Sequence, residues 1–202
     1  MLRRVTAAAL LAGLMTLAAH AQSAPQQPRR FHLPPVDLAV TYDAERGKIA
    51  ASNCGCFWFQ GGGVNSSITL WHGLGFAADI SGGRASEISP GISLSKVNFL
   101  FGPRYTWQVP HFPIAHHAPS LFGEFLFGAA HAYGTVIPSA SGGSSHATAF
   151  AYQTGGGLNL WLAPHFGLRA LELDYVHSQL PNNSNSSQND FRLATGFVWR
   201  FR

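Results

Sequence analysis

Two cysteines lie close enough in the sequence to react with each other. Cys54 and Cys56 are separated by one residue, and such thiols can form a disulfide, pair between molecules or bind a soft metal. Two thiolates alone do not complete a zinc coordination sphere. We therefore expect a structural feature of a polar loop, with a disulfide as the candidate, and no bound metal.

A histidine and a serine further along supply a base and a nucleophile. His177 and Ser178 are adjacent, and Asp190 is the nearest acid downstream. A hydrolase needs the base within hydrogen-bonding reach of the nucleophile. Adjacent residues of an extended strand point to opposite faces, so we expect no catalytic residues here and no cofactor.

Histidine is frequent, with ten residues in the chain. Clustered imidazoles can bind metal ions or change charge near neutral pH. Several of these histidines fall in predicted turns, where none has a carboxylate or a cysteine close in sequence. We expect ordinary turn residues at His72, His111, His116, His117 and His165.

The charged residues alternate with large apolar ones, which is the period of a β-strand. The segment 36–43 places Val40 and Tyr42 on one face and Asp37 and Asp43 on the other. The alternation recurs and predicts eight strands, of which the second is blurred by three glycines. The predicted strands are 36–43, 57–68, 73–81, 96–107, 121–130, 149–162, 169–176 and 191–201.

The connections between these strands differ in character. Four are polar and rich in Ser, Asn or Gly, and we expect long loops at 44–56, 82–91, 133–146 and 177–189. Three carry Pro, His and aromatic residues, at 70–73, 108–119 and 163–167. Long loops at one end and shorter turns at the other are typical of an outer-membrane barrel.

Two runs of three glycines, 61–63 and 155–157, fall inside predicted strands. Neither precedes a helix, so a phosphate-binding loop is not expected. We expect these glycines to leave room for large neighbouring side chains that point inward.

The first 35 residues do not belong to the predicted sheet. Residues 1–21 are typical of a cleaved signal peptide, with Arg3 and Arg4 before an apolar run and small residues at the cleavage site. Residues 22–35 form a Pro- and Gln-rich lead-in, and 36–202 form the barrel domain. Removal of the leader lowers the net charge of +4 by two. The remaining basic residues show no cluster, so nucleic acid is not expected as a partner.

The composition helps to decide whether the apolar face of the strands points outward into lipid or inward in a soluble barrel. Hydrophobic residues make up 46% of the chain and charged residues 11%, against ~25% charged in a typical soluble domain. No apolar run of ~20 residues follows the leader, so we expect no transmembrane helix. A closed barrel also satisfies every backbone group in lipid, with its apolar face outward. The alternative is a soluble barrel that binds a ligand on an inner apolar face.

The polar face of the strands would line the interior. Eight strands make a barrel that is only wide enough for side chains to fill, and an unpaired buried charge is costly. Five acids and four bases nearly balance, so we expect a network of ion pairs instead of an open pore. The network consists of Asp37, Asp79, Lys96, Arg104, Glu124, Glu172, Asp174, Arg192 and Arg200.

The last strand resembles the assembly signal of Gram-negative outer-membrane proteins: a glycine, two residues, an aromatic residue, one residue and a final aromatic residue. Gly196, Trp199 and Phe201 match this pattern, whereas Ala194 and the extra Arg202 depart from it. The resemblance implies the barrel-assembly machinery as a partner during biogenesis.

The region 36–202 resembles the OmpA/OmpX-like superfamily of eight-stranded outer-membrane β-barrels, in blocks such as "FLFGPRYTW" and "LELDYV". The resemblance implies an all-β, eight-stranded antiparallel up-and-down transmembrane β-barrel in the cell outer membrane. Outer-membrane lipids and lipopolysaccharide would surround it. Because eight strands can close within one chain, we expect a monomer.

This fold serves many functions. We expect a non-enzymatic role, either structural in the envelope or in surface interaction through extracellular loops. A small-solute passage and a lipid-modifying enzyme are alternatives. Outer-membrane lipid A deacylases use a His, a Ser two residues on and a Glu, whereas here His177 and Ser178 are adjacent and no Glu follows.

Overall fold

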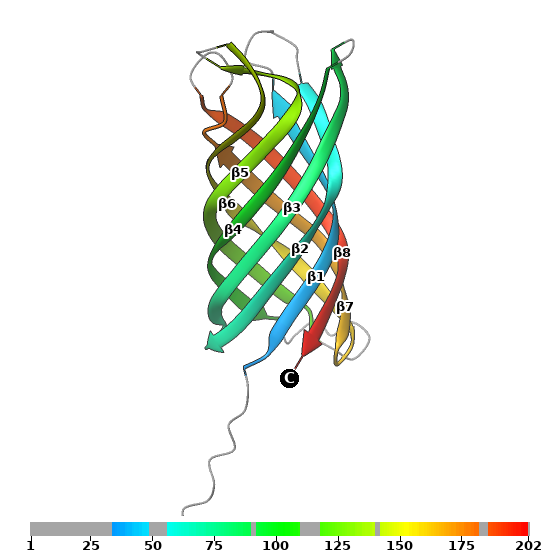
Figure 1. Ribbon diagram of the computed structural model, residues 1–202. Coiled ribbons are helices and arrows are strands. Elements are labelled where there is room, and N and C mark those ends of the chain that lie inside the picture. Colours follow the sequence, from blue (N-terminus) through cyan, green and yellow to red (C-terminus); the bar gives the residue numbers. More distant parts are fainter. Residues whose placement is uncertain are drawn as a thin grey trace, which may run out of the picture. The chain divides into compact units, whose positions relative to one another are not determined.

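In a computed structural model, the chain forms a closed barrel of eight antiparallel strands (Figure 1). The structure describes residues 34–48, 56–89, 92–109, 118–139, 142–181 and 186–201. Among these residues, no helix is long and apolar enough to span a membrane. The strands are β1 (Val36–Lys48), β2 (Cys56–Trp71), β3 (Leu74–Ser89), β4 (Ile92–Gln108), β5 (Ser120–Ser139), β6 (Gly142–Ala163), β7 (Phe166–Ser178) and β8 (Gln188–Phe201).

Each strand pairs with the next along the chain, and β8 pairs with β1 from Val36↔Phe201 to Arg46↔Phe191. This closure confirms the predicted all-β up-and-down barrel, including the glycine-interrupted second strand. We call the end where β1 begins and β8 ends the proximal end, and the opposite end the distal end.

At the proximal end, two turns are tight. His72 and Gly73 join β2 to β3 with positive φ angles of 47° and 88°, which is the backbone of a two-residue hairpin turn. Pro164 and His165 join β6 to β7, where Ala163 pairs with Phe166. Such short links keep neighbouring strands in register.

At the distal end, the expectation of long loops at 82–91 and 133–146 is wrong. β3 runs to Ser89, which pairs with Ile92 of β4, and β5 runs to Ser139, which pairs with Gly142 of β6. These segments lack a regular alternation of polar and apolar residues, although they pair as strands. The β5–β6 hairpin also extends past its neighbours, because the pairing of β4 with β5 stops at Gly134.

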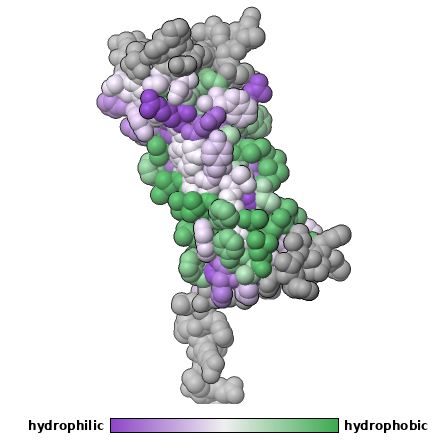
Figure 2. Space-filling view, turned by 90° about the vertical axis from the view of Figure 1, so that its right-hand side faces the viewer, coloured by the Kyte–Doolittle hydropathy of each residue, from purple (hydrophilic) through white to green (hydrophobic). Residues whose placement is uncertain are grey.

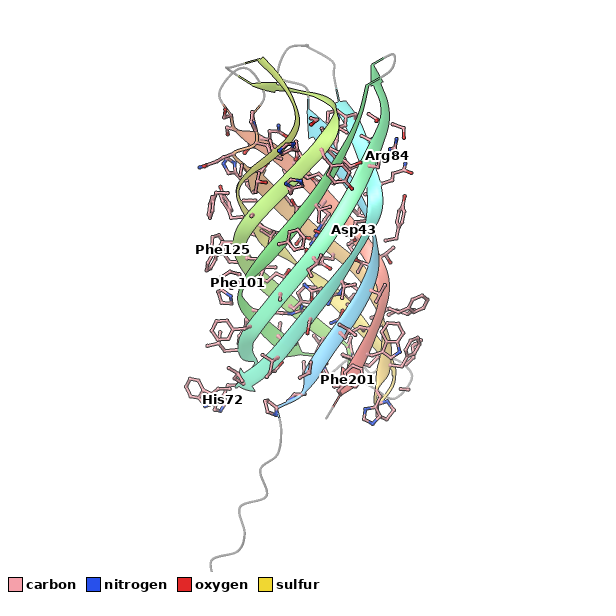
Figure 3. The ribbon with its side chains drawn as sticks, viewed as in Figure 1. Asp43, His72, Arg84, Phe101, Phe125 and Phe201 are labelled. Atoms are coloured by element: carbon pink, nitrogen blue, oxygen red, sulfur yellow. The ribbon has the colours of Figure 1, made fainter. Side chains whose placement is uncertain are left out.

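The two faces of the wall differ sharply in chemistry. Large apolar side chains point outward, such as Phe101 and Phe125 (Figure 3), which are 57% and 46% exposed. A hydrophobic zone covers the middle of the wall and polar residues lie near its distal end (Figure 2). The buried side chains include most of the charged ones. The soluble alternative, with the apolar face inside, is therefore wrong.

Candidate functional site: the charged interior of the barrel

Every residue of the charged network that the sequence placed inside the barrel lies in the interior. Eight of these nine side chains are buried, and Arg200 is partly buried, with 10% of its side chain exposed. They come from six different strands, and the alternation of each strand directs them to the same space.

The distal layer of the interior is centred on Lys96. Its ammonium group donates to Asp190 at 2.8 Å and to Glu45. The ammonium also lies 5.4 Å from the centroid of the Phe59 ring. One buried cation thus serves two buried carboxylates from β1 and β8, which keeps each of them partnered in a medium where an isolated charge would be costly.

The middle layer is centred on Arg192. Its guanidinium pairs with Asp174 at 2.9 Å and with Asp79 at 3.0 Å. Two further carboxylates, Glu172 and Asp43, lie at 3.5 and 4.0 Å from it. This arginine therefore faces more negative charge than it can neutralise.

Next toward the proximal end, two arginines contact the Phe122 ring. The guanidinium carbons of Arg104 and Arg169 lie 3.6 and 4.6 Å from the ring centroid. Arg169 pairs with Glu172 at 2.8 Å, and Arg104 lies 3.4 Å from Glu124. Stacking on an aromatic face suits a planar, weakly hydrated cation.

Trp161 fills the proximal layer. It is only 3% exposed and faces inward, two residues from Asn159. The Arg200 guanidinium lies 3.9 Å from its ring centroid, and its indole nitrogen donates to Ser120 at 3.0 Å. Both ends of this amphipathic ring are thereby satisfied inside the barrel.

The interior is more acidic than the sequence suggested. Asp43, Glu45 and Asp190 are also buried there. Glu45 and Asp190 lie beyond the predicted ends of their strands, whereas Asp43 shares the face of Asp37 and could have been counted. The described interior contains eight carboxylates against five cations: Asp37, Asp43, Glu45, Asp79, Glu124, Glu172, Asp174 and Asp190 against Lys96, Arg104, Arg169, Arg192 and Arg200.

Arg169 was missed for a different reason. Strict alternation would put it on the outer face with Leu171, but β7 contains a bulge in which Ala170 and Leu171 are both exposed. The Thr195 hydroxyl donates to the carbonyl oxygens of Arg169 at 3.0 Å and of Ala170 at 3.4 Å. The extra residue brings Arg169 and Glu172 to the same face, and nothing in the alternation signals it.

Side chains fill the described interior to a high degree. A cavity of about 10 Å³ remains beside Asp43, Ser81 and Lys96. A space of this size holds roughly one water molecule. The carboxylate oxygens of Asp43 and the hydroxyl of Ser81 have no hydrogen-bond partner among the described residues, and such a water would satisfy them.

The fold has clear counterparts among solved structures. Ail, the attachment invasion locus protein of Yersinia pestis, is 18% identical, with 84% of this chain and 100% of that chain covered and a TM-score of 0.54. Neisserial surface protein A is 14% identical, with 83% and 96% covered and a TM-score of 0.58. The chain has the eight-stranded outer-membrane barrel fold. No family model and no curated protein sequence matches it.

Within this barrel fold, the histidine–serine pair is split by the wall. His177 points outward, where its ring stacks on Tyr152 at 4.9 Å and its Nδ1 lies 2.8 Å from the Asn189 amide oxygen. Ser178 is fully buried on the inner side, and Asp190 is engaged with Lys96. These three side chains form no nucleophile–base couple.

Several other sequence predictions fall partly outside the described residues. Cys54 is outside them and Cys56 is the first residue of β2, so the disulfide stays a prediction. His111, His116 and His117 are also outside them. His72 lies in the β2–β3 turn, and His165 Nδ1 lies 2.9 Å from the Arg200 carbonyl oxygen.

The three residues of the terminal motif lie in β8 at the proximal half of the wall. Phe201 is 56% exposed, and the Trp199 ring packs on Phe166 with centroids 5.6 Å apart. A Cβ at Gly196 would overlap the Val40 carbonyl oxygen of β1. Gly196 thus permits the close approach of β8 to β1.

Proposed function

We propose that this protein is an integral outer-membrane β-barrel with a non-enzymatic role, either structural in the envelope or in surface interaction through the loops at its distal end. The observation that carries the proposal is the reversed chemistry of the wall, with large apolar side chains outside and ion pairs inside. In water such a surface would aggregate, whereas in lipid it is the favourable arrangement.

Aromatic residues near both edges of the apolar zone support membrane insertion. Trp71 and Trp107 lie near the proximal end and are 70% and 57% exposed. Trp58 and Tyr133 lie toward the distal end and are 53% and 48% exposed. Amphipathic rings prefer the membrane–water interface, so these side chains would delimit the part of the wall in contact with outer-membrane lipids and lipopolysaccharide.

The filled interior argues against the small-solute passage. The distal and middle layers each contain buried ion pairs that join strands across the barrel, and opening a channel would require breaking several of them. Eight-stranded barrels are only wide enough for such side chains to fill, which leaves no width for a continuous column of water.

A surface role is the first to test. Ail is named for attachment and invasion, and was solved with the heparin analogue sucrose octasulfate. That activity belongs to Ail, and at this identity only the fold is shared. We further propose that residues 1–21 are removed on export, that the motif ending at Phe201 is read by the barrel-assembly machinery, and that the barrel acts as a monomer.

The proposal is tested by fractionating cells that express the full chain and comparing gel mobility before and after boiling. A folded outer-membrane barrel should be found in the outer-membrane fraction. Its gel mobility should differ between the unboiled and the boiled sample. Recovery in the soluble periplasmic fraction without a mobility shift would refute membrane insertion. Ion conductance of the purified barrel in planar bilayers should stay at the background level. Stable open-channel currents would instead support the alternative function as a small-solute passage.

A further inference from the structure

Two glycines in β6 create a recess in the inner wall. Gly155 is the register partner of Glu124 on β5 and of Asp174 on β7. Gly157 is the register partner of Glu172. A Cβ at Gly155 would overlap a carboxylate oxygen of Asp174, and a Cβ at Gly157 would lie 2.7 Å from the Phe122 ring. The recess allows three carboxylates from two strands to converge.

The convergence is close. One carboxylate oxygen of each of the three acids lies within 4.8 Å of the others, and all three side chains are buried. Oxygen ligands of a calcium ion lie 2.3–2.6 Å from the metal, so two of them can be up to roughly 5 Å apart. Magnesium demands shorter bonds and a stricter octahedron, which makes the observed spacing better suited to calcium.

Each of these carboxylates pairs one oxygen with its nearest arginine. Glu172 Oε1 and Asp174 Oδ1 have no hydrogen-bond partner among the described residues. For Glu172 Oε1, the Arg192 guanidinium lies at 3.5 Å. The three ion pairs are Glu124–Arg104 at 3.4 Å, Glu172–Arg169 at 2.8 Å and Asp174–Arg192 at 2.9 Å.

A neutral oxygen is available beside the acids. Gln153 is fully buried, and its amide nitrogen donates to Glu124 Oε1 at 3.3 Å. Its amide oxygen has no hydrogen-bond partner in the described part of the chain, although a buried amide oxygen normally has one. Gln153 faces inward two residues from Gly155, so this unpartnered oxygen lies next to the converging carboxylates.

One divalent cation would neutralise the charge imbalance of the region. Five carboxylates and three guanidinium groups share the two adjoining layers, which leaves two negative charges in excess: Asp43, Asp79, Glu124, Glu172 and Asp174 against Arg104, Arg169 and Arg192. Uncompensated charge in a buried space is costly.

We propose that Glu124, Glu172 and Asp174, with the Gln153 amide oxygen, bind one oxygen-preferring divalent cation of the calcium type inside the barrel. The cation would link β5, β6 and β7 across the glycine recess and neutralise the surplus charge. Because the interior is filled, the ion would enter as the barrel closes and would then exchange slowly.

The test uses the purified full-length barrel, refolded from urea into detergent micelles with excess calcium, with excess magnesium or with EGTA. Each sample is passed over a desalting column, and its metal content is measured by mass spectrometry. Calcium should co-purify in an amount equimolar with the folded barrel and should raise its thermal unfolding temperature above that of the EGTA sample. Magnesium should be retained less.

Matched variants separate a bound ion from general stabilisation. Asp174→Asn removes a proposed ligand and should weaken calcium affinity about tenfold or more. Asp37→Asn makes the same change in the proximal layer and should leave calcium binding intact. If Asp174→Asn does not fold, Gln153→Leu and the metal content of the unchanged protein decide the question.

The proposal is overturned if the folded barrel retains neither calcium nor magnesium, or if the two Asn variants lose calcium equally. Infrared spectra would then show the band of protonated carboxyl groups, which would identify protons as the compensating charge. Gel mobility on the same samples reports barrel folding, so a metal-free but heat-modifiable barrel refutes this inference and leaves the proposed function untouched.

Discussion

Arg200 of β8 and Asp37 of β1 form a two-point ion pair at the seam that closes the barrel. Arg200 Nε lies 2.7 Å from Asp37 Oδ1, and Nη2 lies 2.7 Å from Oδ2. The two residues are register partners, and the guanidinium also stacks on Trp161 of β6. A single side chain near the end of the sequence therefore links the first, sixth and eighth strands.

Arg200→Ala should lower the free energy of unfolding by about 3 kcal/mol, because it leaves Asp37 buried without its partner. The free energy of unfolding of Arg200→Lys should lie between those of Arg200→Ala and the unchanged protein, because lysine keeps the charge but lacks the planar guanidinium group. Urea unfolding in lipid vesicles, followed by tryptophan fluorescence, measures both. The control is Arg84→Ala at an exposed position of β3 (Figure 3). An Arg200→Ala barrel as stable as this control would mean that the seam does not depend on the pair.

Phe101→Arg should destabilise the barrel by about 2–4 kcal/mol, since the side chain points outward where the membrane midplane is proposed. Trp71→Arg, at the proximal edge of the apolar zone, should cost only about 0–1 kcal/mol. The same vesicle unfolding assay compares the two. Equal costs at both positions would contradict the proposed depth of the apolar zone.

Gly155→Ala should impair folding, because its Cβ would overlap both the Asp174 carboxylate and the Leu173 carbonyl oxygen. Gly123→Ala is the matched control on the neighbouring strand, where the nearest atom to a new Cβ is the Gly155 carbonyl oxygen at 3.8 Å. The fraction of protein that migrates as a heat-modifiable band reports folding. We expect a large decrease for the first variant and none for the second.

Deletion of Ala170 should be tolerated. Removing it restores regular alternation in β7 while Arg169 and Glu172 still face inward, because the bulge alone sets their extra spacing. Deletion of Leu173 should instead prevent folding, since a one-residue slip turns half of the strand inside out. Heat-modifiable mobility distinguishes the two, and a folded Leu173 deletion would argue against a register fixed by the interior charges.

The alternation of residues was sufficient to predict the strands within the apolar zone and the direction of most of their side chains, with Arg169 at the β7 bulge as an exception. It is informative there because one face meets an apolar medium and the other meets buried charges, so the two chemistries cannot be exchanged. Lys96 and Phe99 of β4, for example, are separated by an odd number of positions, so Lys96 points inward and Phe99 points outward.

The sequence was less informative where that contrast disappears. The distal parts of β3 and β5 lack a regular alternation of polar and apolar residues, so they resembled loops. Glu45 and Asp190 lie beyond the predicted strand ends and were left out of the network. The recess at Gly155 could not be predicted either, because it depends on which residues of β5 and β7 lie beside it, and register is a property of the closed sheet.

The β5–β6 hairpin that extends past its neighbours has a consequence for how the chain meets other chains. The pairing of β7 with β6 stops at Ala151, and that of β4 with β5 stops at Gly134. Beyond these points the described parts of β5 and β6 pair with each other, and no other described strand continues the ladder along their outer edges. Open edges accept further strands. This ribbon therefore offers a main-chain edge to another chain, outside the apolar zone of the wall.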